Sequence, residues 1–128
     1  YGGLASVMPI YVLIFLVFTM ANIGLPGTSS FVGEFLILTG SFKVNTSITF
    51  LGATSMMIGG GYSLWLFNRI AYGNLKIQHM SKFLDLNLRE CLSFLPLLLG
   101  TLITGIYPDI FLTSIHMSVN NLIELLYF

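Results

Sequence analysis

An interrupted apolar segment near the start of the chain constrains its fold more than any other feature. Residues 21–40 read ANIGLPGTSSFVGEFLILTG, so an apolar run breaks at a proline, glycines and hydroxyl residues and then continues. Glu34 follows the break and is the only acidic residue before Asp85. A helix interrupted at membrane depth, with one ionisable group just beyond the break, is the usual arrangement of an ion path in a transporter.

The composition requires a membrane environment. Hydrophobic residues occupy 55% of the 128 positions and charged residues only 8%, whereas soluble domains carry about 25% charged residues. Such a chain could not cover a water-facing surface, so we expect an integral membrane protein surrounded by lipids. The formal net charge of zero argues against nucleic acid as a partner. The single cysteine, Cys91, excludes an internal disulfide and a cysteine-based metal cluster.

Hydropathy divides the chain into about three membrane spans and a tail. We therefore predict an all-α fold, a polytopic transmembrane helix bundle with one discontinuous helix, as a single unit over residues 1–128. Its segments are a broken helix over 8–42, a polar turn over 43–47, a span over 48–72, a polar loop over 73–87, a span over 88–106 and a tail over 110–128.

The span over 48–72 carries two further patterns. Its three consecutive glycines, 59–61, would let a neighbouring helix approach closely. Aromatic side chains gather toward its end, as at a membrane interface. They are Tyr62, Trp65 and Tyr72.

Charge and polarity orient the later segments. The positive-inside rule places the 73–87 loop on the cytoplasmic or matrix side, with Lys43 and the tail on the opposite side. The basic residues that flank or lie in this loop are Arg69, Lys76, Lys82 and Arg89. Polar side chains of the tail fall roughly on one helical face, which predicts an amphipathic helix at the interface, with a further span as the alternative. They are His116, Asn120, Asn121 and Glu124.

The break contains residue types that end one helix and begin another. Pro26 removes a backbone donor and clashes with the preceding turn, and Gly27 permits a positive φ. The hydroxyl residues at 28–30 can cap a new helix. A single discontinuous span, a span with a short return, and a plain loop between spans all fit this pattern. The candidate site residues here are Gly24, Pro26, Gly27, Thr28, Ser29 and Ser30.

Glu34 is the main candidate for chemistry. A charge at the bilayer centre costs about 2.5–3.5 kcal/mol or more, so such a residue is kept for a use or hidden by pairing. In a dry site, desolvation favours the protonated form more strongly than the positive end of the new helix favours the charged form. Glu34 would then gain and lose a proton near neutral pH. The alternative is a structural glutamate paired with a cation on a neighbouring helix.

The remaining motifs indicate structure more than chemistry. Asn87 can cap the last span, with Glu90 at the capping-box position, and contact with a partner subunit is the alternative. His79 and His116 have no second ligand at metal spacing, so we expect ordinary interface residues. The sequence has no phosphate loop, dinucleotide fingerprint or nucleophile triad. We therefore expect no metal or cofactor in this chain.

Four strings of the sequence resemble one known family. LPGTSSFVGEFLIL, GGGYSLWLFNRIAYGNLK, KFLDLNLRE and GIYPDIF resemble, in order and spacing, the C-terminal part of NADH-ubiquinone oxidoreductase chain 4, in wording closest to mitochondrial versions from plants and protists. These proteins are antiporter-like subunits of the membrane arm of respiratory complex I. The resemblance implies a discontinuous span over 8–42, a matrix-side loop over 73–87 and a multi-pass location in the mitochondrial inner membrane.

The resemblance also implies a function. Glu34 would be the outlet-side proton-transfer residue of a central polar axis. Redox chemistry would occur in other subunits, where electrons pass from NADH through FMN and iron–sulfur clusters to ubiquinone. The partners would be the other membrane-arm subunits, including the family's earlier helices. Those helices are missing here, either because the chain is a fragment or because the gene is split.

Two other hypotheses remain open. A cation/proton antiporter subunit would share the broken helix, although related antiporter-like subunits usually have a lysine where this chain has Glu34. A purely structural membrane subunit would use Glu34 only as one half of a buried pair.

Overall fold

All regular structure in the described residues is helical. The computed structural model describes residues 2–75 and 84–126, and the all-α prediction is confirmed there. The helices are α1 (Leu4–Val7), α2 (Pro9–Ile23), α3 (Ser29–Val44), α4 (Thr46–Ala71), α6 (Leu88–Ile106) and α7 (Asp109–Leu126).

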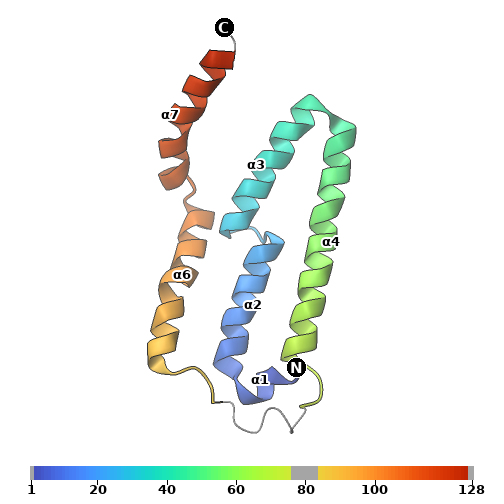
Figure 1. Ribbon diagram of the computed structural model, residues 1–128, viewed down its shortest axis with the longest axis vertical. Coiled ribbons are helices and arrows are strands. Elements are labelled where there is room, and N and C mark those ends of the chain that lie inside the picture. The colour runs from blue at the N-terminus through green and yellow to red at the C-terminus, as the bar shows by residue number, and fades with distance from the viewer. Residues whose placement is uncertain (1, 76–83, 127–128) are drawn as a thin grey trace.

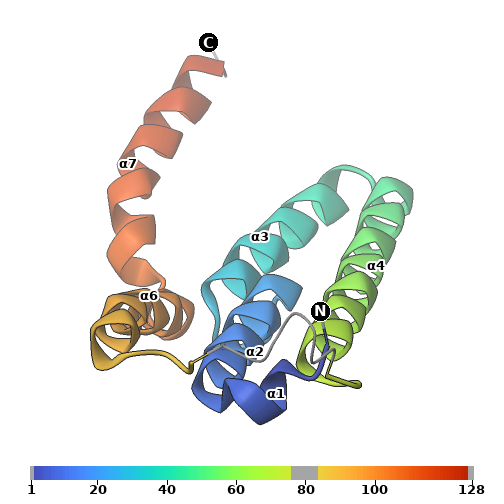
Figure 2. The same ribbon diagram turned by 60° about the horizontal axis from the view of Figure 1, so that its bottom comes forward.

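The helices form a narrow bundle around an interrupted central column. Figure 1 shows α3 following α2 in roughly the same direction, with α4 returning beside both. In both ribbon views the α2–α3 column lies between α4 and α6 (Figures 1 and 2). Figure 2 also shows α7 leaving α6 at an angle and extending beyond the other helices. The interruption predicted within 8–42 therefore occupies the middle of the bundle.

The connection between α3 and α4 is shorter than the sequence predicts. We expected a polar turn over 43–47, but Val44 ends α3 and Thr46 begins α4, so only Asn45 joins them. The Asn45 side chain accepts hydrogen bonds from the backbone N–H groups of Ser47, at 3.0 Å, and Ile48, at 3.4 Å. This cap satisfies two free donors at the start of α4, which is why the helix begins before residue 48.

A small apolar cluster joins the beginning of the chain to the end of α4. Leu4 and Val12 pack with Phe67 and Ala71, and all four side chains are buried. Phe15 of α2 stacks on Phe67 with ring centroids 5.6 Å apart. Burial of these apolar side chains fixes α2 against the C-terminal half of α4.

The start of α6 matches its predicted cap. Asn87 is the N-cap residue and Glu90 closes the capping box, with the Asn87 N–H donating to Glu90 Oε2 at 3.1 Å. The helix has the predicted bounds, 88–106. The predicted basic side chains Lys76 and Lys82 lie outside the described residues.

Length and apolarity distinguish the helices as possible spans. Among the described helices, α6 is both long and apolar enough to cross a membrane by itself, whereas α2 is apolar but has only 15 residues. α4 has 26 residues, about 39 Å at 1.5 Å per residue, with more polar side chains. The short α2 helix needs the continuation provided by α3 to reach across a hydrocarbon layer about 30 Å thick.

The tail is one exposed helix. α7 has the predicted polar face, on which Asn120 Nδ2 lies 3.1 Å from His116 Nδ1. Large apolar side chains on the rest of α7, such as Phe111, Ile115 and Leu122, are exposed as well. This pattern agrees with the amphipathic helix expected from the sequence.

Candidate functional site

Two consecutive turns separate α2 from α3. Gly24 ends α2 in the left-handed region, with φ of 81°, and the Leu25 N–H donates to the Met20 carbonyl at 3.3 Å. This conformation is the usual glycine terminus of a helix, because a residue without Cβ adopts a positive φ at little cost.

The second turn leads the chain into α3. The Thr28 N–H donates to the Leu25 carbonyl at 3.1 Å, with Pro26 in the second position and Gly27, φ 94°, in the third. These residues have the signature of a type II turn, which favours proline and then a residue with positive φ. The predicted roles of Pro26 and Gly27 at the break therefore agree with the structure.

The predicted hydroxyl cap is absent at the start of α3. Thr28 occupies the N-cap position, but its side chain makes no cap hydrogen bond. Its hydroxyl donates instead to the Leu25 carbonyl at 2.7 Å, so it reinforces the turn. Ser29 lines a cavity of about 200 Å³ that lies between α3, α6 and α7. The N-terminus of α3 thus has no side-chain cap, although three hydroxyl residues lie beside it.

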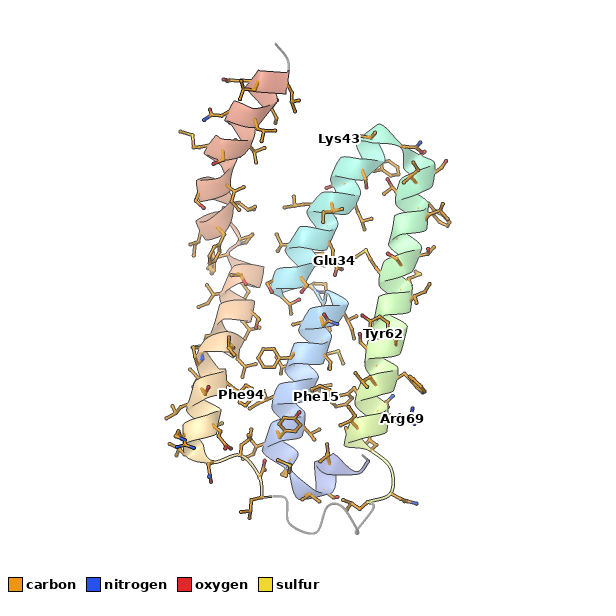
Figure 3. The ribbon with its side chains drawn as sticks, viewed as in Figure 1. Phe15, Glu34, Lys43, Tyr62, Arg69 and Phe94 are labelled. Carbon is orange, nitrogen blue, oxygen red and sulfur yellow. The ribbon has the colours of Figure 1, made fainter. Side chains whose placement is uncertain are left out.

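Glu34 lies against the last turn of α2. A Cβ atom added to Gly24 would be 2.5 Å from Glu34 Oε2 and 3.1 Å from its Cδ. Figure 3 shows Glu34 near the base of α3, close to the end of α2. Gly24 is therefore required for two reasons, since its φ is positive and its missing side chain leaves room for the carboxylate.

One oxygen of Glu34, Oε2, is buried without a hydrogen-bond partner among the described residues. An unsatisfied buried acceptor costs about 1–3 kcal/mol, and more when it is charged. A proton, a water molecule or a cation from another helix would remove that cost. Glu34 is therefore the polar group of this site that most needs a further partner.

A polar cavity of about 320 Å³ adjoins Glu34 between the α2–α3 column and α4. Polar groups reach it from three helices: Asn22 from α2, Glu34 from α3, and Ser55 and Tyr62 from α4. It is large enough for several water molecules, since each occupies about 30 Å³ of liquid. Glu34 thus borders a partly open space between helices that water can occupy.

Glycines and a buried serine shape the α4 side of this cavity. A Cβ added to Gly60 would lie 3.4 Å from Ile23 Cγ2, so α4 is in side-chain contact with α2 at this glycine. Ser63 Oγ donates to the Gly59 carbonyl at 2.7 Å and accepts from Asn22 Nδ2 at 3.5 Å. Of the three glycines predicted to allow a close helix approach, Gly60 alone faces α2, since a Cβ at Gly59 or Gly61 would meet no atom of that helix.

Sequence reasoning missed three of the cavity's polar residues. Asn22 reads as a lone polar residue in an apolar run, and Tyr62 was assigned to the membrane interface. Ser55 and Tyr62 are seven residues apart, which is nearly two helical turns and places them on one face of α4. That spacing, with Gly59 between them, was the available signal. The spacing could not show that α3 places Glu34 against the same face of α4.

The remaining charged and metal-ligating residues lie away from this site or outside the described residues. A larger cavity of about 480 Å³ near Lys43 is lined mostly by apolar side chains such as Phe35 and Phe50, so it does not suit proton chemistry. Arg69 lies over the Trp65 ring, 5.4 Å from its centroid, at the opposite end of α4 (Figure 3). No cluster of three metal-ligating side chains occurs within residues 2–75 and 84–126. His79 lies outside the described residues.

Comparisons with known proteins find similar sequences among NADH-quinone and NADH-ubiquinone oxidoreductase subunits. Residues 1–60 match a family model described as NADH:quinone oxidoreductase/Mrp antiporter, TM. NADH-ubiquinone oxidoreductase chain 4 of Marchantia polymorpha is 54% identical over 124 residues, and that of Arabidopsis thaliana is 52% identical over 124 residues. NADH-quinone oxidoreductase subunit M of Rhodobacter capsulatus is 44% identical over 124 residues.

The three alignments cover the chain almost completely and the relatives only in part. Each includes 97% of this chain, but the chain spans only about a quarter of the length of these curated relatives, at 25%, 25% and 24%. The resemblance to chain 4 indicated by the sequence strings is confirmed over this length.

Proposed function

We propose that this chain, which resembles part of NADH-ubiquinone oxidoreductase chain 4 over nearly its whole length, belongs to the proton-translocating membrane arm of complex I. Within that arm we assign Glu34 to proton transfer on the outlet side of an antiporter-like path. The observation that carries this proposal is the buried, unpartnered Glu34 Oε2, which lies at a helix break beside a polar cavity.

The surroundings of Glu34 support a role in moving protons. A carboxylate at the end of a broken helix exchanges protons only if a donor or acceptor can reach it. Water in the 320 Å³ cavity would provide that contact, held by Asn22, Ser55 and Tyr62. Gly24 keeps the carboxylate against the break, because any side chain there would displace it. A proton received from the interior of the arm would leave through this cavity.

The arrangement of helices supports a membrane placement. We infer that α2 and α3 form one discontinuous span and that α4 and α6 form the next two. The loop over 73–87 would face the matrix, and α7 would lie at the opposite interface of the mitochondrial inner membrane. The exposed apolar side chains of α6, such as Leu92 and Leu97, would then contact lipid or neighbouring subunits.

This chain would bind none of the redox groups of the complex. NADH, FMN, iron–sulfur clusters and ubiquinone would react in other subunits. Its contribution would be electrostatic and conformational, since charge changes along the arm would alter the proton affinity of Glu34. Its partners would include the subunit's earlier helices, on the same chain or on a separate one.

Membership of complex I is tested on a native gel. Detergent-solubilised membranes would be separated, stained for NADH dehydrogenase activity, and the active band analysed by intact-mass spectrometry. This chain should be found in the active band, either at 14.2 kDa or as part of a longer polypeptide. Its absence from the active band would refute the assignment.

A second candidate function follows from the family match itself. The family model includes Mrp antiporter membrane subunits, so a cation/proton antiporter fits the same broken helix. Sodium-dependent proton movement in vesicles without NADH would favour that function. A purely structural role predicts instead that Glu34→Ala leaves proton movement by the assembled complex unchanged.

A further inference from the structure

The segment from Asp85 to Gly105 contacts the start of α2 and the turn that follows the end of α2. At the first end, the Asp85 carboxylate accepts the Ile10 N–H at 3.1 Å and the Tyr11 N–H at 3.4 Å. These donors belong to the first turn of α2, whose N–H groups have no acceptor within the helix. A residue 75 positions away along the chain therefore caps α2 and joins the start of α6 to it.

At the other end, α6 touches the break directly. A Cβ added to Gly105 would lie 2.5 Å from the Gly27 carbonyl carbon and 2.6 Å from that of Thr28. A Cβ atom cannot lie so close to backbone atoms, so the two segments meet here only because residue 105 is glycine. Between the two ends, the rings of Phe94 and Phe18 lie 6.5 Å apart; Figure 3 shows Phe94 on the side of α6 that faces α2.

We propose that residues 85–105 act as a brace that sets the position of the helix break, with Asp85 and Gly105 as positioning residues for Glu34. Asp85 fixes the first turn of α2, and Gly105 fixes the turn that follows it. Gly24 and the Glu34 carboxylate lie between the second contact and the α4 cavity, so a shift of the turn would move them. The effect on proton transfer rests on the proposed function, whereas the effect on the break does not.

Alanine substitutions in α6 provide a matched pair. Gly105→Ala places a methyl group into the turn at Gly27, whereas Gly100→Ala meets nothing within 4 Å on the same helix. Both changes replace a glycine of α6 with alanine, which by itself favours a helix, so intrinsic propensity explains a disruption in neither variant. Any difference between the two variants reports the contact with the break.

The first readout is amide hydrogen exchange in the intact complex. We expect Gly105→Ala to accelerate exchange in peptides covering residues 24–34, and Gly100→Ala to leave it unchanged. The second readout is the number of protons moved per NADH oxidised, together with its pH profile, at equal amounts of assembled complex. We expect Gly105→Ala to lower this ratio and to shift its pH profile, because a displaced Glu34 transfers protons less effectively.

Asp85 supplies a second test if Gly105→Ala fails to assemble. Asp85→Ala should accelerate exchange at Ile10 and Tyr11 and lower the proton ratio, and Asp85→Asn, which keeps one acceptor oxygen, should restore part of both. Equal exchange and equal coupling in the Gly105→Ala and Gly100→Ala complexes would overturn the brace, as would an Asp85→Ala complex that behaves like the parent. Faster exchange with an unchanged proton ratio would support the brace and overturn the proton role of Glu34.

Discussion

The two connections made by α3 differ in how they treat free helix ends. Asn45 joins α3 to α4, and its side chain accepts from two backbone donors at the start of α4. At the break, Thr28 holds the equivalent position before α3, but its hydroxyl bonds back to Leu25 and leaves the helix start without a side-chain cap. The Asn45 connection satisfies two backbone donors at the start of α4. The break leaves the N–H groups at the start of α3 without a side-chain acceptor, beside the cavity that Ser29 lines.

Under the proposed function, this difference separates a structural turn at Asn45 from a functional one at the break. A buried polar group without a partner destabilises the fold, so it persists where a use offsets its cost. The break combines an uncapped helix start, two glycines with positive φ and an unpartnered carboxylate oxygen. The Asn45 connection has none of these features. Substitutions at the break should therefore change proton transfer, and those at Asn45 should change only stability.

The largest effect is expected from Gly24→Ala. The added Cβ would strain a residue with φ of 81° and would collide with Glu34 Oε2. The positive φ alone costs about 1–3 kcal/mol, and a displacement of about 1 Å can lower a rate by roughly 100-fold. Proton pumping should fall steeply in the assembled complex. Gly40→Ala, on the same helix as Glu34 and with nothing within 4 Å, is the control and should pump normally.

A smaller effect is expected from Asn45→Ala. Loss of the cap should lower stability by about 0.5–2 kcal/mol, because the Ser47 and Ile48 donors lose their acceptor. Thermal unfolding of the purified complex measures the loss, and Asn45→Asp should restore most of it. Protons moved per NADH should stay at the parent value. A lowered ratio would mean that this connection also takes part in transport.

The smallest effect is expected at acidic pH, in the hydrogen bonds between Asp85 and the first turn of α2. Desolvation raises the pKa of Asp85, but hydrogen bonds from Ile10, Leu86 and Tyr11 outweigh it and lower the pKa below its usual value of 3.8. The charged form is therefore favoured in the folded state. Its contribution to stability is complete above pH 3.8 and is lost as pH falls through the lower folded value. In that acidic range, amide exchange at Ile10 and Tyr11 should become faster in the parent than in Asp85→Asn at the same pH.

Local sequence signals predicted much of this fold. The proline and glycines located the break, the capping box located the start of α6, and the apolar runs gave the all-α class. Each of these features depends on residues that are close together in the sequence, so a short stretch of sequence is enough to predict it. The Asn45 cap was missed because a short polar segment was read as a turn, although asparagine before a helical run is itself a cap signal.

The contacts between distant residues could not be predicted in this way. Asp85 caps a helix whose first turn lies at residue 10, and Gly105 meets the backbone of Gly27. Glu34 was identified from its isolation in an apolar sequence, but its contact with Gly24 depends on how α3 folds onto α2. Such pairings are set by the tertiary arrangement of helices, about which hydropathy and propensity carry little information.

The most direct test of the account is the proton yield of a Glu34→Gln complex. Glutamine keeps the size and hydrogen-bonding capacity of the side chain but cannot carry a proton. Glu124→Gln, at an exposed position on α7, makes the same chemical change away from the cavity. With assembly verified on a native gel, the account predicts fewer protons moved per NADH oxidised in Glu34→Gln and the parent value in Glu124→Gln. Normal pumping by a fully assembled Glu34→Gln complex would contradict it.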